Sequence, residues 1–502
     1  MSCSFRLWAL TLLLGSAGSA LAEPPSLTWH DPAGGRRGKT VAVTMGFKAD
    51  LESLRVWTDT EHLQVTVPDK VDGKFMVEVA DDAAVGAHWI RLIDAQGVSE
   101  ARQFMVGTLP EIVEEEPNGS YHSYDLVEES LPLTVNGKLG RRGDVDAFAW
   151  NLEVGEWLVA SVDAHALDSP IDPMLRLVTA QGDQLAFAHD NDRGGLDPSL
   201  AFQAPAKGRY ILLLSGFGYP PKADSRFTGG ENVIYRLHAQ NGPPSFDNAA
   251  YHDEEPNQTA DSALPLAEDA LRRGLLGDVE DEDWYRFIPT AKDQTYEVQV
   301  KAQVLGSKID GWLEIRDEAG KVLASSDDSG RHTSPDPMLT WKAPSRDPHF
   351  VVVRDVRRYG GPRYHYQLLV NRANPRFDII ASEDRWTVFQ GGSVEITMNV
   401  VRQHGHAEAI TLEALGLPGG LTCAPVLVSS DQKQAILTIM ANEDVEPQSW
   451  AIQWTAGGQG ARYSHKGTFA DAGALFLNEH SKMWITVRSK EKAPTKQSRQ
   501  GL

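Results

Sequence analysis

The chain has 502 residues and a formal net charge of −21. This acidity argues against a nucleic-acid ligand, because phosphates require clustered Lys and Arg side chains. The length corresponds to about four domains at roughly 100–150 residues each. Cys3 and Cys423 are the only cysteines in the sequence, so the chain has no disulfide framework and its stability must come from large cores or bound metal.

The first residues predict export. Arg6 precedes a mostly apolar run at 7–14, and a small-x-small cleavage site follows at 20–22. Residues 1–22 are therefore interpreted as a signal peptide. The apolar run is too short to span a bilayer comfortably, and no other segment comes close. We expect an exported protein without a membrane span that is periplasmic, displayed at the cell surface or secreted.

Residues 23–108 predict an immunoglobulin-like β-sandwich. Apolar and polar residues alternate at 41–44, 63–67 and 75–79, and more loosely at 89–92. A period of two is typical of half-buried strands, and Gly and Asp clusters separate the runs. Short strands at this spacing favour a sandwich, and no stretch carries a helical period.

A segment of domain length occurs twice. Glu115–Asn118 (Glu-Glu-Pro-Asn) returns as Glu254–Asn257, and the landmarks keep an offset of 137 to 139 residues. The further matching pairs are 144–148 with 281–285, 172–175 with 310–313, 197–200 with 336–339, and 204–205 with 343–344. A repeat of this size indicates tandem domains rather than a solenoid. Alternating strands predict an antiparallel sandwich in each copy, at 111–242 and 250–373.

The remainder predicts a fourth unit and a tail. Strand patterns at 394–400, 435–440 and 450–454 predict a second immunoglobulin-like sandwich over 375–487. Residues 488–502 are basic and polar, so we expect a disordered tail. The predicted fold class is all-β, with four tandem β-sandwich domains.

Acidic residues recur at the start of each repeat. Glu114, Glu116 and Asn118 are two apart, so in an extended segment they project on one side, and Asp144 and Asp146 form a second such pair. The second copy offers the corresponding set Asp253, Glu255, Asn257, Asp281 and Asp283. Hard oxygen ligands of this kind suit Ca²⁺. The alternative is that these are solvated carboxylates of an acidic exported protein; recurrence in both copies favours calcium.

The repeats resemble the bacterial pre-peptidase C-terminal (PPC) domain, a jelly-roll-like β-sandwich related to the collagen-binding domains of clostridial collagenases. The matching motifs are the Glu-Pro-Asn opening, the Gly-Asp-Val-Asp-Ala-Phe segment at 143–148, Asp-Pro-x-Leu at 172–175, the turn at Gly182, Ala-Pro at 204–205 and Tyr-x-Leu at 235–237.

The resemblance implies calcium near the N-terminal linker, held by a Glu-x-Glu-x-Asn-Asp segment and downstream aspartates. It assigns Glu114, Glu116, Asn118, Asp144 and Asp146 as candidate metal ligands, and the five corresponding residues of the second copy are candidates for a second site. Gly119 and Gln258 stand where the relatives often have Asp, and Asp253 replaces the first Glu of the motif. The first copy is therefore the stronger calcium candidate.

The outer units resemble immunoglobulin-like modules that accompany such domains in large exported proteins of planctomycete-type bacteria. The matching segments are 32–38 and 86–92 in the N-terminal unit and 415–421 in the C-terminal unit.

Two further groups of residues have open interpretations. The acidic stretches 190–192 and 327–329 could hold a cation, but a polar hairpin turn is favoured. Aromatic residues near the last strand of each repeat could stack on sugars, pack on peptides or anchor their own loops. They are Phe217, Tyr219, Phe227, Tyr359 and Tyr364.

Catalytic motifs are absent from the mature sequence. His404-Gly405-His406 lacks the spacing of a zinc helix and is expected to be a solvated turn. Ser215 lacks the flanking glycines of a nucleophile elbow and is expected to end a strand. Cys423 is expected to be a small buried apolar residue rather than a reactive thiol.

The sequence thus predicts a non-enzymatic, exported modular protein that binds or scaffolds extracellular protein or polysaccharide. The alternatives are a secreted peptidase and an accessory subunit of a separate peptidase. The sequence specifies neither the ligand nor the oligomeric state.

Overall fold

The computed structural model describes residues 23–190, 196–221, 223, 226–242, 254–303, 307–327, 336–361, 363–457, 459–461, 463–464 and 479–489. The described residues form β-strands and one short 3-10 helix, η1 (His165–Leu167), which confirms the all-β class. They contain no helix long and apolar enough to cross a membrane. The predicted signal peptide, Asp253 and the tail beyond residue 489 lie outside these ranges.

The N-terminal sandwich consists of two sheets with strand orders β1-β3-β6-β5 and β2-β9-β7-β4, and β8 pairs with β7. Its strands are β1 (Ser26–Asp31), β2 (Gly34–Arg36), β3 (Lys39–Lys48), β4 (Arg55–Thr58), β5 (Leu63–Thr66), β6 (Phe75–Val79), β7 (Gly86–Asp94), β8 (Gly97–Val98) and β9 (Arg102–Gly107). Phe75, Val77 and Val79 of β6 are buried while Met76 and Glu78 are exposed, as the alternating sequence predicts.

The first repeat packs the sheet β10-β12-β19-β14-β17 against the sheet β11-β13-β18-β15-β16. Its strands are β10 (Glu111–Val113), β11 (Asp125–Leu126), β12 (Leu133–Lys138), β13 (Asp146–Leu152), β14 (Trp157–Asp163), β15 (Ile171–Thr179), β16 (Gln184–His189), β17 (Ser199–Gln203), β18 (Gly208–Gly218) and β19 (Ile234–Gln240).

The second repeat has the sheets β21-β28-β23-β26 and β20-β22-β27-β24-β25. Its strands are β20 (Leu264–Leu266), β21 (Leu271–Leu275), β22 (Glu282–Phe287), β23 (Thr295–Lys301), β24 (Gly311–Arg316), β25 (Val322–Ser326), β26 (Met338–Lys342), β27 (His349–Asp355) and β28 (His365–Arg372). The strand orders of the two copies match position for position, apart from the additional β10 of the first. The repeat in sequence is therefore a repeat of one fold.

The C-terminal sandwich packs β29-β31-β35-β33 against a sheet that contains β30-β40-β36-β32-β34. Its strands are β29 (Arg376–Ala381), β30 (Arg385–Phe389), β31 (Ser393–Gln403), β32 (Ile410–Leu415), β33 (Leu421–Cys423), β34 (Val426–Val428), β35 (Gln434–Ala441), β36 (Ser449–Ala456), β37 (Gln459–Gly460) and β40 (Met483–Arg488); β38 (Tyr463–Ser464) and β39 (Glu479–His480) form a separate pair.

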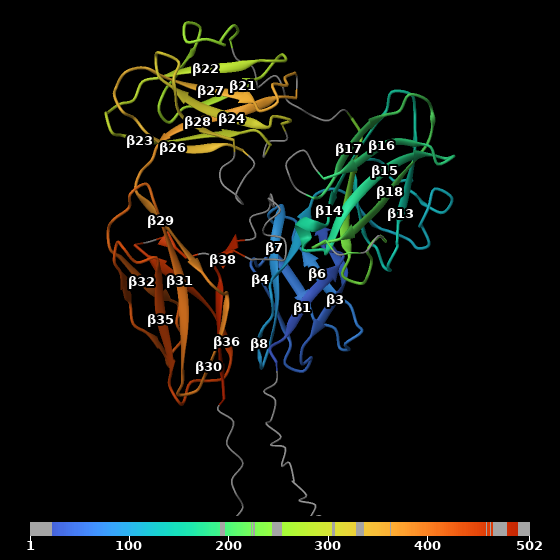
Figure 1. The fold of residues 1–502 in the computed structure, drawn as a ribbon. Coiled ribbons are helices and arrows are strands. Elements are labelled where there is room, and N and C mark those ends of the chain that lie inside the picture. Colours follow the sequence, from blue (N-terminus) through green and yellow to red (C-terminus); the bar gives the residue numbers. More distant parts are fainter. Residues whose placement is uncertain are drawn as a thin grey trace, which may run out of the picture.

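Side-chain contacts join the N-terminal sandwich to the first repeat and the second repeat to the C-terminal sandwich. Arg102 of the N-terminal sandwich forms an ion pair with Asp168 of the first repeat, with 2.9 Å between the charged atoms. Glu297 of the second repeat accepts hydrogen bonds from Arg376 and His404 of the C-terminal sandwich, each at 3.1 Å. The N-terminal and C-terminal sandwiches also lie side by side (Figure 1).

Candidate metal centres

Three carboxylates meet at the start of β13 in the first repeat. Glu116, Asp144 and Asp146 each offer one oxygen, and these oxygens all lie within 4.8 Å of one another. Asp146 begins β13, which lies between β11 and β18, and its side chain is fully buried, whereas Glu116 is exposed. The cluster thus has a buried base formed by the aspartates and an exposed edge formed by the glutamate.

Asn118 adds an amide to this cluster. Its backbone N–H donates to Glu116 Oε2 at 3.1 Å, and its backbone carbonyl accepts from the Ala147 N–H at 2.9 Å. The Asn118 side chain is fully buried, and its Nδ2 donates to Asp125 Oδ2 at 3.3 Å. Among the described residues, Asn118 Oδ1 and Asp146 Oδ1 are buried acceptors that receive no hydrogen bond. Such atoms are costly unless a donor or a cation satisfies them.

Glu114 lies behind the cluster rather than in it. Its Oε1 accepts from the Lys138 backbone N–H at 2.7 Å, and its Oε2 lies 2.8 Å from the Tyr235 hydroxyl. The same hydroxyl lies 2.6 Å from Asp146 Oδ2. Burial, followed by the charge of Glu114, raises the pKa of Asp146 to about 10. Glu114 and Tyr235 therefore fix the orientation of Asp146 from the side away from the cluster.

The second copy reproduces the cluster. Glu255, Asp281 and Asp283 offer oxygens that lie within 4.8 Å of one another. Asn257 is fully buried, its N–H donates to Glu255 Oε2 at 3.0 Å, and its carbonyl accepts from the Trp284 N–H at 3.0 Å. These contacts match those of the first copy atom for atom. Two unlike sequences thus place the same residue types in the same arrangement.

The supporting residues differ between the copies. The Tyr366 hydroxyl donates to Asp283, as Tyr235 does to Asp146, but it also lies 2.7 Å from the Tyr285 hydroxyl. The predicted ligand Asp253, at the position of Glu114, lies outside the described residues.

The exposed edge of the second cluster carries an additional side chain. Gln258 Nε2 donates to Glu255 Oε2 at 2.7 Å and to Asp281 Oδ1 at 3.3 Å. Gly119 occupies the corresponding position in the first copy and has no side chain. A surface hollow of about 580 Å³ borders the second cluster and is lined in part by Glu255, Gln258 and Asp281. The hydrogen bonds from the Gln258 amide engage carboxylate oxygens that a bound cation would need.

A third group of possible ligands lies at the end of β16. His189 Nε2 is 3.0 Å from Asp172 Oδ1, and His189 Nδ1 is 3.6 Å from Asp190 Oδ2. Asp190 has a φ of 62°, as expected for a turn residue. His189 and Asp190 are exposed, and residues 191–192 and 328–329 of the predicted acidic stretches lie outside the described residues. This group has no buried base of the kind that Asp146 provides.

The aromatic residues singled out in the sequence separate into two kinds. Tyr364 packs against the core of its repeat, and the ring of Tyr219 meets that of His165 edge-on at 5.1 Å. The rings of Phe227 and Phe217 pack against each other with their centroids 5.3 Å apart. Phe217 is 38% exposed and Tyr359 is 53% exposed. These two aromatic side chains remain accessible on the surface.

The residues considered as catalytic candidates have other surroundings. His404 contacts Glu297, and His406 contacts Arg402 at 2.7 Å. The prediction that Ser215 ends a strand is wrong, because β18 continues for three residues to Gly218 and pairs Ser215 with Met174 of β15. Burial raises the pKa of the Cys423 thiol, which disfavours the reactive thiolate.

The structure also contains a hydroxyl–imidazole–carboxylate series that the sequence gave no reason to expect. Thr134 Oγ1 is 2.9 Å from His238 Nδ1, and His238 Nε2 is 2.9 Å from Asp163 Oδ2. The three residues come from β12, β19 and β14, so no local motif unites them. Thr134 is only 2% exposed, so its hydroxyl has no access to a substrate. The series is a polar ladder across one sheet.

Comparison with known proteins gives limited similarity. No family model matches the chain. A protein of Deinococcus radiodurans described as "Probable subtilase-type serine protease" is 32% identical over 107 residues, which is 20% of this chain and 14% of that protein. The chain thus matches only a small part of the length of this relative.

Solved structures with a similar arrangement include the N-terminal four Ig domains of Dscam1 isoform 4.44, at 10% identity and a TM-score of 0.22, covering 93% of this chain and 100% of that one. Domains 1–6 of the surface layer protein SbsC align at 10% identity and a TM-score of 0.18, covering 94% of this chain and 55% of that one. A Bacteroides ovatus protein solved with a mixed-linkage heptasaccharide aligns at 9% identity and a TM-score of 0.15, covering 67% and 72%. These scores are too low to carry an argument about function. The strand order itself defines the class: a multi-domain β-sandwich protein.

Proposed function

We propose that this is an exported, non-catalytic binding or scaffolding protein whose PPC-type repeats are stabilised by calcium. The observation that carries the proposal is the first acidic cluster. It combines three carboxylates with the Asn118 amide, and two of its buried oxygens, Asn118 Oδ1 and Asp146 Oδ1, receive no hydrogen bond among the described residues. Ca²⁺ takes carboxylate and amide oxygens and would satisfy these atoms.

The residues have two kinds of role in this proposal. Glu116, Asp144, Asp146 and Asn118 supply oxygens to the cation. Glu114 positions Asp146 through the Tyr235 hydroxyl, which contacts both carboxylates. Glu116 and Asn118 lie in the segment before β11, whereas Asp146 begins β13. A cation shared by these residues would tie that linker segment to the sandwich.

The second cluster is proposed as a weaker site for the same cation. Glu255, Asp281, Asp283 and Asn257 are equivalent in position, but the Gln258 amide donates to two of the carboxylates. A cation must displace these hydrogen bonds before it binds. We therefore expect the first repeat to bind calcium at lower concentrations than the second.

The partner is proposed to be an extracellular protein or a polysaccharide. Phe217 and Tyr359 expose aromatic surface, which suits stacking on sugars or packing on peptides. The similarity of 107 residues of this chain to a subtilase-type protease of Deinococcus radiodurans is what we would expect if the PPC-type repeats are modules that accompany peptidases. A secreted peptidase, or an accessory subunit of a separate peptidase, remains the alternative, and a protease assay on the purified chain separates them.

Calorimetric melting with calcium and with a chelator tests the metal proposal. We expect calcium to raise the melting temperature of the full chain and Asp146→Asn to abolish most of the rise. Asp183→Asn, which alters an exposed carboxylate outside the cluster, is the matched control. Identical melting curves with calcium and with chelator would refute calcium binding. A glycan and matrix-protein array then identifies the partner, and the absence of any bound component would count against the binding role.

A further inference from the structure

The N-terminal and C-terminal sandwiches share an apolar contact. Ile93 and Val98 of the first sandwich form one buried cluster with Trp484 of the last, and Trp57 and Ala451 pack against it. The rings of Trp57 and Trp484 meet edge-on, with centroids 5.5 Å apart. Aromatic pairs in this geometry add to the effect of the buried area. The ends of the chain are thus joined by a small hydrophobic core of their own.

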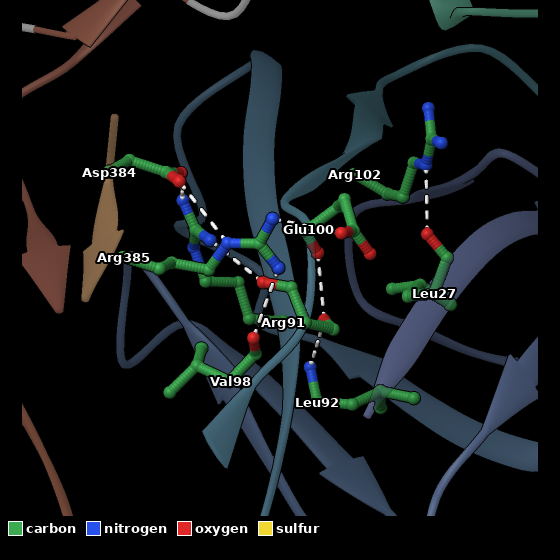
Figure 2. A network of polar contacts seen from close by, with 9 residues as sticks. Leu27, Arg91, Leu92, Val98, Glu100, Arg102, Asp384 and Arg385 are labelled. Carbon is green, nitrogen blue, oxygen red and sulfur yellow. Dashed lines mark hydrogen bonds and ion pairs between the residues drawn. The ribbon is translucent and has the colours of Figure 1, made fainter. Parts of the chain in front are cut away.

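A buried ion pair lies beside this core. Arg91 of β7 is only 1% exposed, and its guanidinium contacts Asp384, which lies 293 residues later in the sequence (Figure 2). Arg91 also donates to the Ser99 carbonyl at 2.8 Å. A buried charge is strongly unfavourable when its partner is removed. The first sandwich therefore holds a buried cation whose contacting carboxylate comes from the last sandwich.

Polar contacts surround the buried pair. Arg385 forms an ion pair with Glu100 at 2.8 Å and donates to the Val98 carbonyl at 3.1 Å (Figure 2). Arg488 donates to Gln96 Oε1 at 2.5 Å. An apolar centre with a polar rim is the usual anatomy of a specific interface rather than of an incidental touch.

The two ends of the described chain meet at the same place. A Cβ on Gly97 would lie 3.2 Å from Pro24 and 3.6 Å from Thr486. The Arg102–Asp168 pair joins the first repeat to the N-terminal sandwich, and the Glu297–Arg376 pair joins the second repeat to the C-terminal sandwich. The contact between the first and last sandwiches therefore links these two pairs of sandwiches.

We propose that the interface between the first and last sandwiches is an intramolecular clasp that joins the two halves of the chain, each made of one outer sandwich and its adjoining repeat. The clasp is formed by the Arg91–Asp384 pair, the Arg385–Glu100 pair and the Trp57–Trp484 contact. It holds both repeats in one fixed arrangement, so a partner that touches both meets a preorganised surface rather than a flexible string. This inference does not depend on calcium or on the identity of the partner.

Specific cleavage of the full-length mature protein between the repeats tests the clasp. A protease site is inserted between Gly242 and Glu254, the protein is cut, and the two halves are analysed by gel filtration with light scattering. We expect the uncut protein to have the mass of one chain and the cut halves to elute together at micromolar concentration. Halves that separate, or an uncut dimer whose clasp joins two copies, would overturn the proposal.

Variants connect this result to the named residues. Asp384→Asn removes the negative charge that Arg91 contacts across the interface, so we expect the association of the cut halves to weaken about a hundredfold. The apolar pair Arg91→Met with Asp384→Leu is expected to restore co-elution, because buried ion pairs can be replaced by apolar residues of similar volume.

A second substitution and a control keep the test decisive if the buried variants fold poorly. Arg385→Glu faces Glu100 with a like charge at the partly exposed rim, and we expect about tenfold weaker association. Arg376→Glu disrupts a comparable ion pair within one half and is expected to leave co-elution unchanged. If Arg376→Glu separates the halves as well as Arg385→Glu does, charge reversal acts nonspecifically and the clasp is refuted.

Discussion

The two repeats have matching strand orders and the same acidic trio, but the edges of their clusters differ. In the first copy Gly119 offers no side chain to Glu116 and Asp144, and Asp144 accepts from the Arg141 backbone N–H at 3.2 Å and lies 3.4 Å from the exposed Arg141 guanidinium. In the second copy the Gln258 amide donates to Glu255 and Asp281. A duplicated sandwich can therefore preserve the buried half of a site, which the fold holds in place, while a single residue at the edge changes how readily a cation binds.

The largest expected effect concerns a buried carboxylate that is not part of the clusters. Asp197 accepts hydrogen bonds from the His165 and Ala166 N–H groups at 2.8 and 2.9 Å, and burial raises its pKa from 3.8 to about 7. The folded state therefore holds the proton on the Asp197 carboxyl group more tightly than the unfolded state does. The contribution of this protonated carboxyl group to folding stability is complete below pH about 4 and is lost as the pH rises through about 7.

We expect the unfolding free energy of the first repeat to fall by on the order of 4 kcal/mol over this range, at about 1.36 kcal/mol per pKa unit. Denaturant titrations at several pH values measure it, and Asp197→Asn should flatten the profile. A wild-type profile that rises with pH over the same range contradicts the assignment.

The next effect compares the two clusters directly. At a calcium concentration about a hundredfold above the dissociation constant, binding stabilises the folded state by about 2.7 kcal/mol. We expect Asp146→Asn to remove this gain and Asp283→Asn to remove a smaller one at the same calcium concentration. Calcium titrations followed by calorimetry measure both. Equal losses would show that the two sites do not differ.

Gln258→Asp should strengthen the second cluster. It replaces an amide that donates to Glu255 and Asp281 with a further oxygen ligand, so we expect calcium affinity to rise about tenfold, or about 1.4 kcal/mol. Gln258→Ala separates the two causes, because it removes the amide without adding a ligand. If neither variant binds calcium more tightly than the wild type, the amide is not what weakens the site.

Gly119→Asp should have the smallest effect, because no side chain amide at position 119 has to be displaced from the first cluster. A Cβ at Gly119 would lie 3.3 Å from the Val145 carbonyl oxygen, so a small local adjustment is needed. We expect calcium affinity to rise by about 0.5–1 kcal/mol, as for one added hydrogen-bonding oxygen. Isothermal titration measures the change, with Gly119→Ala as the control for the adjustment. If Gly119→Asp binds calcium more weakly than Gly119→Ala does, the aspartate side chain does not reach the cation as expected.

Much of the fold followed from alternation in the sequence. The strands expected at 75–79 and 394–400 are present within β6 and β31, because buried and exposed residues alternate along them. Short edge strands were not predicted. β11 has two residues and β20 has three, too few to display a period, and each is held by parallel pairing with a distant strand.

The candidate site was predictable in part for the same reason. Residues two apart lie on one side of an extended segment, and Glu116, Asp144 and Asp146 each have an oxygen within 4.8 Å of the others. That these residues hold a cation stays a prediction. Glu114 follows the same spacing but faces Tyr235, because β12 and β19 present a backbone N–H and a hydroxyl to it. Only the packed sheets reveal this second environment.

The all-β class, the duplication and the residue types at each acidic cluster can be read from the sequence, since they depend on local period and spacing. Which oxygens are buried, how Gln258 covers one cluster, and that Arg91 meets Asp384 emerge only when the sandwiches pack. Burial and contacts between residues 293 positions apart depend on how whole sandwiches pack, and no local pattern encodes that packing.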